Sequence, residues 1–165
     1  MILLKNIPLM GKGYNGLKSV TEVARILYGA PESEREEKND LVARLGKKHQ
    51  VGYLNDFLGF AFELSRCKDS RLLPRQYDLV IYDTLLYGEE WLPETRAENF
   101  QYTITPFFAK KDVPIIILAD EAIKEKIIDW ALSRQSHYIA QPYSISEVAK
   151  MVNSLLPKRP RKLSR

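Results

Sequence analysis

The chain has 165 residues, a length that fits one compact domain with at most a modest appendage. Hydrophobic residues make up 45% and charged residues 28%, enough for a buried core under an ordinary polar surface. No apolar run approaches the roughly 20 residues that a membrane-spanning helix needs, and no signal-peptide pattern is present. The single cysteine excludes an internal disulfide, and the two isolated histidines, His49 and His137, lack metal-ligand spacing. We therefore expect a cytoplasmic protein with no membrane association, no metal and no cofactor.

The net charge of +4 is concentrated at the C-terminal end. Residues 157–165 contain no anion and five cations: Lys158, Arg159, Arg161, Lys162 and Arg165. Removing these five from the 25 cations leaves 20 against 21 acidic residues, so the rest of the chain is nearly neutral. We predict one domain over residues 1–156 followed by a basic tail over 157–165. A basic tail can contact nucleic-acid phosphates, which makes a nucleic-acid-associated regulator one candidate function.

The first half of the chain gives irregular signals. Met1–Leu4 is a predicted strand, and Leu17–Tyr28 is a predicted helix. The strongly charged stretch near residues 30–40 is predicted to be an exposed loop or a solvated helical insertion. A strand is then predicted over His49–Leu54 and an aromatic-rich helix over Phe57–Cys67. The helix prediction over Leu17–Tyr28 depends on apolar residues at helical spacing: Val20, Val23, Ala24 and Leu27.

The second half alternates strand and helix signals. The apolar runs Tyr77–Asp83 and Val113–Ala119 are typical of strands that are buried on both faces. Between them, residues 85–111 are predicted to be an irregular insertion. Apolar residues recur at helical spacing between Asp120 and Gln135, and a short strand is predicted over His137–Ala140.

The last helix is the best marked element. Ser144 and Glu147 form a capping-box pattern at its start, and Pro157 ends it. Strands that alternate with helices in this order predict a parallel sheet joined by right-handed crossovers.

Three of these segments resemble the receiver domain of two-component response regulators. Asp83 ends a strand as the phosphoacceptor aspartate does, and Ala119 ends the strand that normally finishes in Thr or Ser. Gln141-Pro142 follows the last strand, where receivers carry Lys-Pro and usually a cis peptide, and Tyr138 falls at the position of their switch aromatic. The resemblance implies a flavodoxin-like three-layer sandwich with a central parallel sheet of five strands.

The chain departs from the receiver pattern at the chemical positions. If Met1–Leu4 is the first strand, Lys5 and Asn6 stand where receivers place two acidic residues that bind magnesium. The hydroxyl position is Ala119 and the lysine position is Gln141, so only Asp83 of the chemical set remains. Phosphoryl transfer needs cations that neutralise the charge developing on the phosphoryl oxygens. We therefore predict a pseudo-receiver without magnesium-dependent phosphorylation, in which Lys5 has the charge to pair with Asp83.

Three functions remain open at this point. The leading one is a non-enzymatic signalling module that binds a protein partner or a second copy of the chain. The others are a nucleic-acid-associated regulator that uses the basic tail, and a genuine receiver with Asp83 as phosphoacceptor. By resemblance, the partner surface is the face from Asp120 to Leu156, with Trp130, Tyr138 and Pro142 as switch or interface residues. The aromatic segment from Trp91 to Phe108 is the alternative surface.

Overall fold

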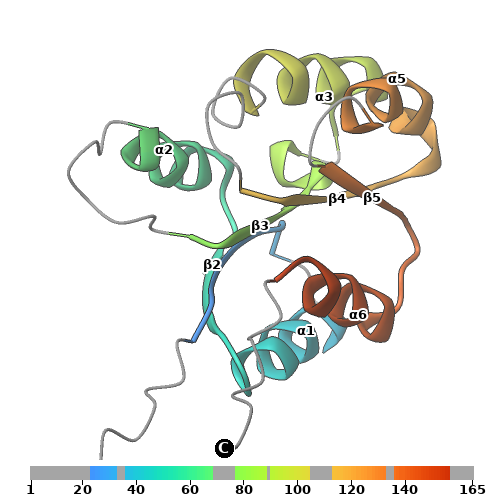
Figure 1. Ribbon diagram of the computed structural model, residues 1–165. Coiled ribbons are helices and arrows are strands. Elements are labelled where there is room, and N and C mark those ends of the chain that lie inside the picture. The colour runs from blue at the N-terminus through green and yellow to red at the C-terminus, as the bar shows by residue number, and fades with distance from the viewer. Residues whose placement is uncertain are drawn as a thin grey trace, which may run out of the picture.

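A five-stranded, all-parallel sheet forms the centre of the computed structural model (Figure 1). The structure describes residues 23–32, 36–68, 77–88, 90–104, 113–132 and 136–156. The strand order is β2-β1-β3-β4-β5. The strands are β1 (Arg25–Gly29), β2 (Gln50–Leu54), β3 (Leu79–Asp83), β4 (Ile115–Ala119) and β5 (Ser136–Ala140).

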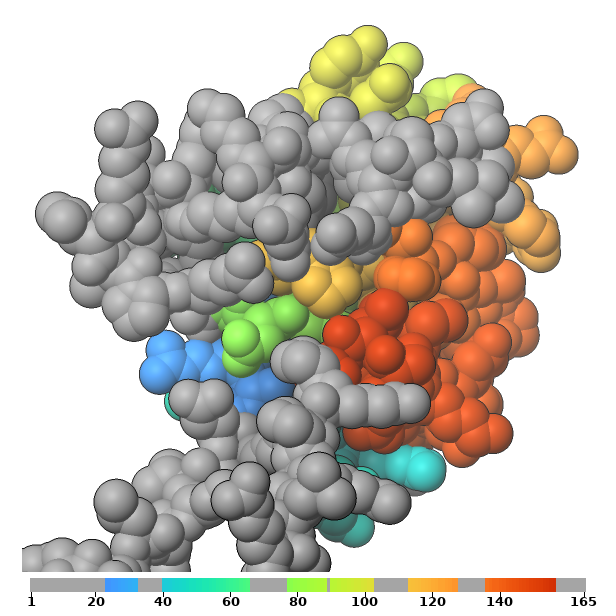
Figure 2. Space-filling model, viewed as in Figure 1, coloured from blue at the N-terminus to red at the C-terminus, as the bar shows by residue number. Residues whose placement is uncertain are grey.

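Helices cover both faces of this sheet. They are α1 (Glu36–Gly46), α2 (Phe57–Lys68), η1 (Thr84–Tyr87), α3 (Pro93–Asn99), η2 (Phe100–Ile104), α5 (Glu121–Leu132) and α6 (Ile145–Leu155). Figure 1 shows α1 and α6 on one face and α2, α3 and α5 on the other. In the space-filling view, the red atoms of α6 adjoin the cyan atoms of α1, with which α6 is in contact (Figure 2). The predicted flavodoxin-like three-layer sandwich is thus confirmed.

Two apolar cores follow from this layering. Ile26, Tyr28, Ile81 and Ile116 point to the α1–α6 layer, where they meet Leu41, Leu45, Val148 and Val152. Leu27, Val80, Tyr82 and Ile117 point to the other layer, where they meet Phe60, Leu64, Phe100 and Ile123. Every residue of β3 and β4 is buried, as their continuous apolar runs predict for central parallel strands.

The predictions for the second half agree with the structure. Strands β3, β4 and β5 and helix α5 lie within one or two residues of their predicted places. Ser144 caps α6, and its side-chain oxygen accepts a hydrogen bond from the backbone N–H of Glu147 at 3.1 Å. Strand β2 and helix α2 also confirm their predictions.

The first half needs corrections. The prediction of a helix through Tyr28 is wrong, because Arg25–Gly29 forms β1 at the centre of the sheet. The predicted strand Met1–Leu4 lies outside the described residues. Of the stretch predicted to be an exposed loop or a solvated helical insertion, residues 36–40 form the start of α1, in which Asp40 is exposed and the following Leu41 and Leu45 are buried against the core. In the second half, the segment 85–111 contains most of η1 and all of α3 and η2, and its residues 89 and 105–111 lie outside the described ones.

No helix in the described part of the chain is long and apolar enough to cross a bilayer.

Gly29 ends β1 beneath the layer of α2. A Cβ atom at this position would overlap the buried ring of Phe60 and would lie 2.8 Å from Cδ2 of Leu86. Gly52 on β2 is less restricted, because its nearest neighbour would be the Tyr77 hydroxyl at 3.7 Å, an ordinary contact. The close approach of α2 to the sheet therefore requires a residue without a side chain at position 29 and not at position 52.

We expect Gly29→Ala to lower the free energy of unfolding by about 1–3 kcal/mol, because the added methyl group overpacks a closed core. The matched control, Gly52→Ala, should leave stability unchanged or slightly raised. Chemical denaturation of both variants measures the difference. Equal stability of the two variants would show that the α2 layer adapts freely to the methyl group.

Candidate functional site

The carboxyl ends of β1, β3, β4 and β5 place the candidate residues at one edge of the sheet. Gly29 pairs with Tyr82, so the next residues of the two strands, Ala30 and Asp83, are neighbours. On the other side of β3, Asp83 pairs with Leu118. Ala119 then pairs with Ala140, the residue before Gln141. The structure therefore brings Asp83, Ala119 and Gln141 together, as the resemblance implies.

Asp83 is fully buried and is held by neutral donors. Its Oδ1 atom accepts a hydrogen bond from the Leu85 backbone N–H at 2.9 Å, which caps η1. The same atom accepts a hydrogen bond from the Gln141 side-chain amide at 3.0 Å. Gln141 therefore reaches Asp83 from the lysine position and offers an amide in place of an ammonium group.

Other hydrogen bonds at this edge end on β4. The Ala119 carbonyl accepts from the Gln141 backbone N–H at 2.8 Å and from the Tyr138 hydroxyl at 3.2 Å. The hydroxyl of Thr84, which follows Asp83, donates to the Leu118 carbonyl at 3.2 Å. Tyr138 is half-buried against the core, and the Gln141-Pro142 peptide is cis, in agreement with the sequence prediction.

The end of β1 corrects the assignment of Lys5 and Asn6. That assignment depended on Met1–Leu4 being the first strand, and both residues lie outside the described ones. The place next to β3 belongs to β1, so the residues that follow it are Ala30 and Pro31. A buried alanine and a half-buried proline therefore stand at this place beside β3.

These residues do not fit a magnesium ion. Mg²⁺ prefers octahedral oxygen ligands and is usually held by one or two carboxylates. The first acidic residue after β1 is Glu32, which is exposed and accepts a hydrogen bond from the Asn55 side-chain amide at 3.3 Å. Among the described residues, no group of three or more His, Cys, Asp or Glu side chains is placed to hold a metal.

Three tyrosines near Asp83 were not predicted from the sequence. Tyr28 of β1 is fully buried, and its hydroxyl lies 3.4 Å from that of Tyr143, which follows Pro142. Tyr53 of β2 packs against Tyr28 with 5.5 Å between ring centroids, and its hydroxyl donates to the Ala30 and Pro31 carbonyls at 3.1 and 3.3 Å. The sequence pattern does not identify such residues, because a tyrosine at the end of an apolar strand cannot be distinguished from any other core aromatic residue.

The environment keeps these phenols neutral. Burial raises the pKa of Tyr28 far above its ordinary value, and the neighbouring Tyr143 and the charge of Asp83 raise it further. Burial likewise raises the pKa of Tyr53, with smaller contributions from Glu32 and Asp83. The tyrosines therefore supply uncharged hydrogen-bonding groups and no nucleophile.

A buried ion pair lies beside this edge. Nη1 of Arg96 on α3 is 2.9 Å from Oδ2 of Asp120, the residue after β4, and the Arg96 side chain is only 6% exposed. Oδ1 of Asp120 also accepts a hydrogen bond from the Ile123 backbone N–H at 3.1 Å, which caps α5. Asp120 thus ties α3 to the start of α5.

The other predicted residues are exposed or lie outside the described part of the chain. Pro142 is exposed beside Gln141, and Trp130 lies on α5, with a side chain outside the described ones. The tail residues Lys158, Arg159, Arg161, Lys162 and Arg165 also lie outside the described part of the chain.

No protein-family model and no curated protein sequence matches this chain. Solved receiver domains do match its structure. The receiver domain of a Francisella response regulator aligns with 80% of this chain and 95% of its own, at a TM-score of 0.52 and 16% identity. The regulatory domain of the repressor of iron transport regulator, in its inactive form, aligns with 79% of this chain and 93% of its own, at a TM-score of 0.51 and 20% identity. The receiver domain of the hybrid histidine kinase CckA aligns with 81% of this chain and 99% of its own, at a TM-score of 0.51 and 14% identity. The chain therefore has the receiver fold.

We expect Asp120→Asn to destabilise the domain by about 2 kcal/mol, because it leaves the Arg96 guanidinium buried without its counter-charge. Asparagine is also a good helix cap, so the start of α5 is preserved and the effect isolates the ion pair. The double variant Arg96→Met/Asp120→Asn should recover part of the loss, since it removes the buried charge. A double variant less stable than Asp120→Asn would contradict this account of the pair.

Proposed function

We propose that this chain is an atypical receiver-type signalling module that acts by binding a protein and does not take up a phosphoryl group in a magnesium-dependent way. One observation carries the proposal: Gln141, in the lysine position, donates its amide to Asp83 across the edge of the sheet. Ala30 and Pro31 in the acidic positions and Ala119 in the hydroxyl position support the same conclusion. The proposal assigns no catalysis to the chain.

The chemistry of these groups explains why phosphorylation is not expected. In the transfer of a phosphoryl group, negative charge spreads over its oxygens and requires metal ions or fixed cations nearby. An amide supplies only a neutral hydrogen bond, roughly half as strong as one that involves a charged group. Because alanine has no hydroxyl, the end of β4 also lacks the side chain that would contact a phosphoryl group and report its presence.

The alternative, a genuine phosphoacceptor, uses the same aspartate. Asp83 stands at the end of the central strand, as the acceptor of a receiver does. Its side chain is fully buried, however, and Oδ1 already accepts two hydrogen bonds. Attack on a phosphoryl donor through this atom would first require both bonds to break.

An exposed apolar surface supports the protein-binding part of the proposal. On α2, Leu58 and Phe62 lie one helical turn apart, and the Phe62 side chain is 66% exposed. The adjacent Phe57 makes an edge-on contact with Tyr87 at 5.1 Å, and Tyr87 contacts Trp91 at 5.6 Å. We call this the aromatic surface; it consists of Phe57, Leu58, Phe62, Tyr87, Trp91 and Leu92. Contiguous apolar area of this kind is typical of protein-interaction sites.

The described residues on the face of α5, β5 and α6 offer less exposed apolar surface. Tyr138 is half-buried, with its hydroxyl bound to the Ala119 carbonyl. Lys124 and Lys126 on α5 form ion pairs with Glu121 and Glu94. We therefore place the partner site on the aromatic surface, which shares Trp91 and Leu92 with the segment Trp91–Phe108 that the sequence offered as the alternative and adds residues of α2 and η1.

Incubation with Mg²⁺ and acetyl phosphate, or with beryllofluoride, should leave the mass and the amide NMR spectrum of the protein unchanged, because the lysine position carries the neutral amide of Gln141 and the residues after β1 carry no carboxylate before Glu32. An ordinary receiver treated in parallel is the positive control. Stoichiometric labelling that disappears in Asp83→Asn would establish the phosphoacceptor function in place of the proposed one.

A charge on the aromatic surface should abolish protein binding without affecting the fold. We expect Phe62→Glu to remove self-association in sedimentation velocity, or capture of a cross-linked partner in cells, while the melting temperature changes little. The matched control is Ala122→Glu, at an exposed position on α5 of the opposing candidate face. Loss of binding in Ala122→Glu alone would move the partner site to the face of α5, β5 and α6.

A further inference from the structure

The two chain segments that form the aromatic surface contain no basic residue. Residues 50–65 contain two acidic residues and residues 77–95 contain five, and neither range contains a Lys or an Arg. In the whole chain, by contrast, 25 Lys and Arg residues outnumber 21 Asp and Glu residues. The first cation after Phe62 along α2 is Arg66, one turn closer to the amino edge of the sheet, and its side chain lies outside the described part of the chain. The lack of cations is therefore a local property of this surface.

Two exposed carboxylates border the apolar side chains. Asp56 stands directly before α2, and its Oδ1 atom accepts a hydrogen bond from the Gly59 backbone N–H at 2.6 Å, so it caps the helix beside Phe57. Glu90 stands directly before Trp91 and is also exposed. Within the described ranges, neither carboxylate forms an ion pair. Their negative charge is thus available to a partner.

The turn from Tyr87 to Trp91 places the second carboxylate among aromatic rings. Gly88 has a φ of 132°, and its carbonyl accepts a hydrogen bond from the Trp91 backbone N–H at 3.4 Å. The Glu90 carboxylate lies against the same glycine, because a Cβ atom at Gly88 would be 2.6 Å from Oε1 and 2.8 Å from Oε2. The Tyr87 and Trp91 rings are 5.6 Å apart, and Trp91 is 47% exposed. One turn therefore carries a carboxylate and two aromatic rings.

This combination of groups suits a Lys or Arg side chain. A cation over an aromatic face is attracted by the ring electrons, most strongly at Trp, and a neighbouring carboxylate adds a charge-assisted hydrogen bond. On α2, Leu58 and Phe62 form an apolar ridge one turn apart, of the kind that packs against another helix. The aromatic surface therefore fits a partner that carries apolar and cationic side chains next to each other.

We propose that the partner segment bound by the aromatic surface is a basic amphipathic helix of another protein. Its large apolar side chains pack on Leu58 and Phe62, and a Lys or Arg beside its apolar stripe contacts Glu90 and Trp91. An amphipathic helix presents apolar side chains one turn apart with charged residues along the stripe, which matches this surface. The inference rests on the proposed function, since it names the class of partner for the same surface.

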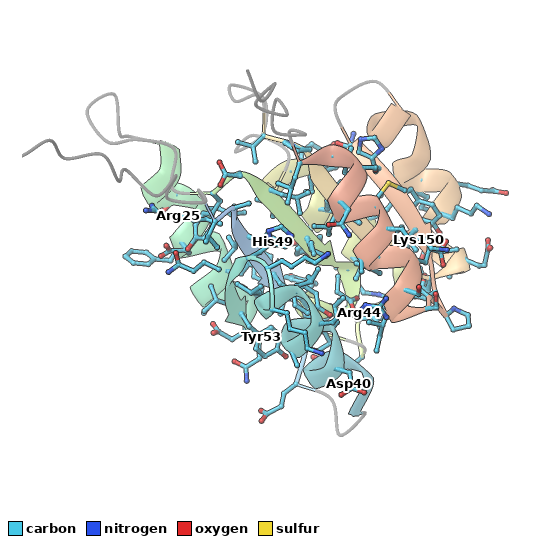
Figure 3. The ribbon with its side chains drawn as sticks, turned by 60° about the horizontal axis from the view of Figure 1, so that its bottom comes forward. Arg25, Asp40, Arg44, His49, Tyr53 and Lys150 are labelled. Carbon is cyan, nitrogen blue, oxygen red and sulfur yellow. The ribbon has the colours of Figure 1, made fainter. Side chains whose placement is uncertain are left out.

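The exposed cations that the structure describes belong to other parts of the molecule. Figure 3 labels Arg44 and Lys150 on α1 and α6, in the helix layer opposite α2. Arg25 and the lysines at 47–48 stand at or before the amino ends of β1 and β2, whereas Asp56 follows the carboxyl end of β2. The described cations of α3 and α5 are paired with carboxylates. No described cation thus offsets the charge of the aromatic surface.

The same charge argues against other occupants. In a symmetric dimer, this surface of one copy would face the same surface of the other, where the described residues supply no cation for Asp56 and Glu90. Nucleic-acid phosphates and anionic lipid headgroups are repelled by these carboxylates. A cationic protein segment is the occupant for which both the apolar and the charged parts of the surface are favourable.

The test uses the full chain and two synthetic peptides of about 18 residues, or roughly five helical turns. One contains only leucine and lysine in an amphipathic pattern, and the other has glutamate in place of every lysine. Neither contains Trp, so the two tryptophans of the protein report binding by fluorescence. We expect the lysine peptide to bind at least about tenfold more tightly than the glutamate peptide at low salt, with an advantage that falls as salt rises.

The variant Asp56→Asn/Glu90→Gln removes both charges and should weaken binding of the lysine peptide about fivefold, since exposed ion pairs each contribute little. Asparagine keeps the cap of α2, so the fold is preserved. The matched control, Asp40→Asn/Glu125→Gln, makes the same two substitutions at exposed positions on α1 and α5. It should change the affinity less than about twofold. Phe62→Ala should weaken the lysine peptide as well, because the apolar ridge is shortened.

Other results overturn the inference. Equal affinity for both peptides, lost for both in Phe62→Ala, would leave a protein-binding surface without preference for cations, so the proposed function would survive. A lysine peptide that binds Phe62→Ala as tightly as the unmodified chain occupies another surface. Self-association that Phe62→Glu abolishes in the absence of peptide would assign the surface to a second copy. Binding of neither peptide would exclude a basic helix, and the Phe62→Glu experiment on protein capture then decides the proposed function separately.

Discussion

Burial of β3 on both faces constrains every polar group at the carboxyl edge of this sheet. A buried donor or acceptor without a partner costs about 1–3 kcal/mol, so a central strand can end in a carboxyl group only if neighbouring elements supply donors. At Asp83 the donors come from the Leu85 backbone on one side and the Gln141 side chain on the other. Because Gln141 follows β5, one hydrogen bond links the third and fifth strands across the end of β4. The geometry of the edge therefore depends on this contact.

Under the proposed function, this edge serves a structural role where receivers have a reactive site. A receiver site must hold a metal ion and a transferred phosphoryl group, which keeps charged groups at the end of a buried sheet. Here the corresponding positions carry a methyl group, a proline and an amide, and three neutral tyrosines line the adjacent core. Neutral hydrogen bonds satisfy the same buried atoms without the cost of desolvating separate charges.

The sequence predicted those parts of the fold in which local and global signals agree. The continuous apolar runs of β3 and β4 admit no amphipathic helix, and the cap at Ser144 marks one starting point for α6. Strand β1 was missed because the positions of Val20, Val23, Ala24 and Leu27 match a helical period by coincidence. Its true boundary is set by a distant contact, the ring of Phe60 over Gly29, which no local pattern contains. The error in β1 then carried into the site, where Lys5 and Asn6 were placed in positions that belong to Ala30 and Pro31.

The two helix layers present different chemistry to their surroundings. Exposed apolar and aromatic side chains gather on α2 and the segment before α3, whereas exposed cations lie on α1 and α6. The sheet lies between these layers, so the two surfaces face away from each other (Figure 1). Coupling between ligands bound to the two layers would have to pass through a two-state element shared by both. The element common to both layers is the central sheet, whose strands β3, β4 and β5 are joined at the carboxyl edge by the hydrogen bonds of Asp83, Gln141 and Ala119.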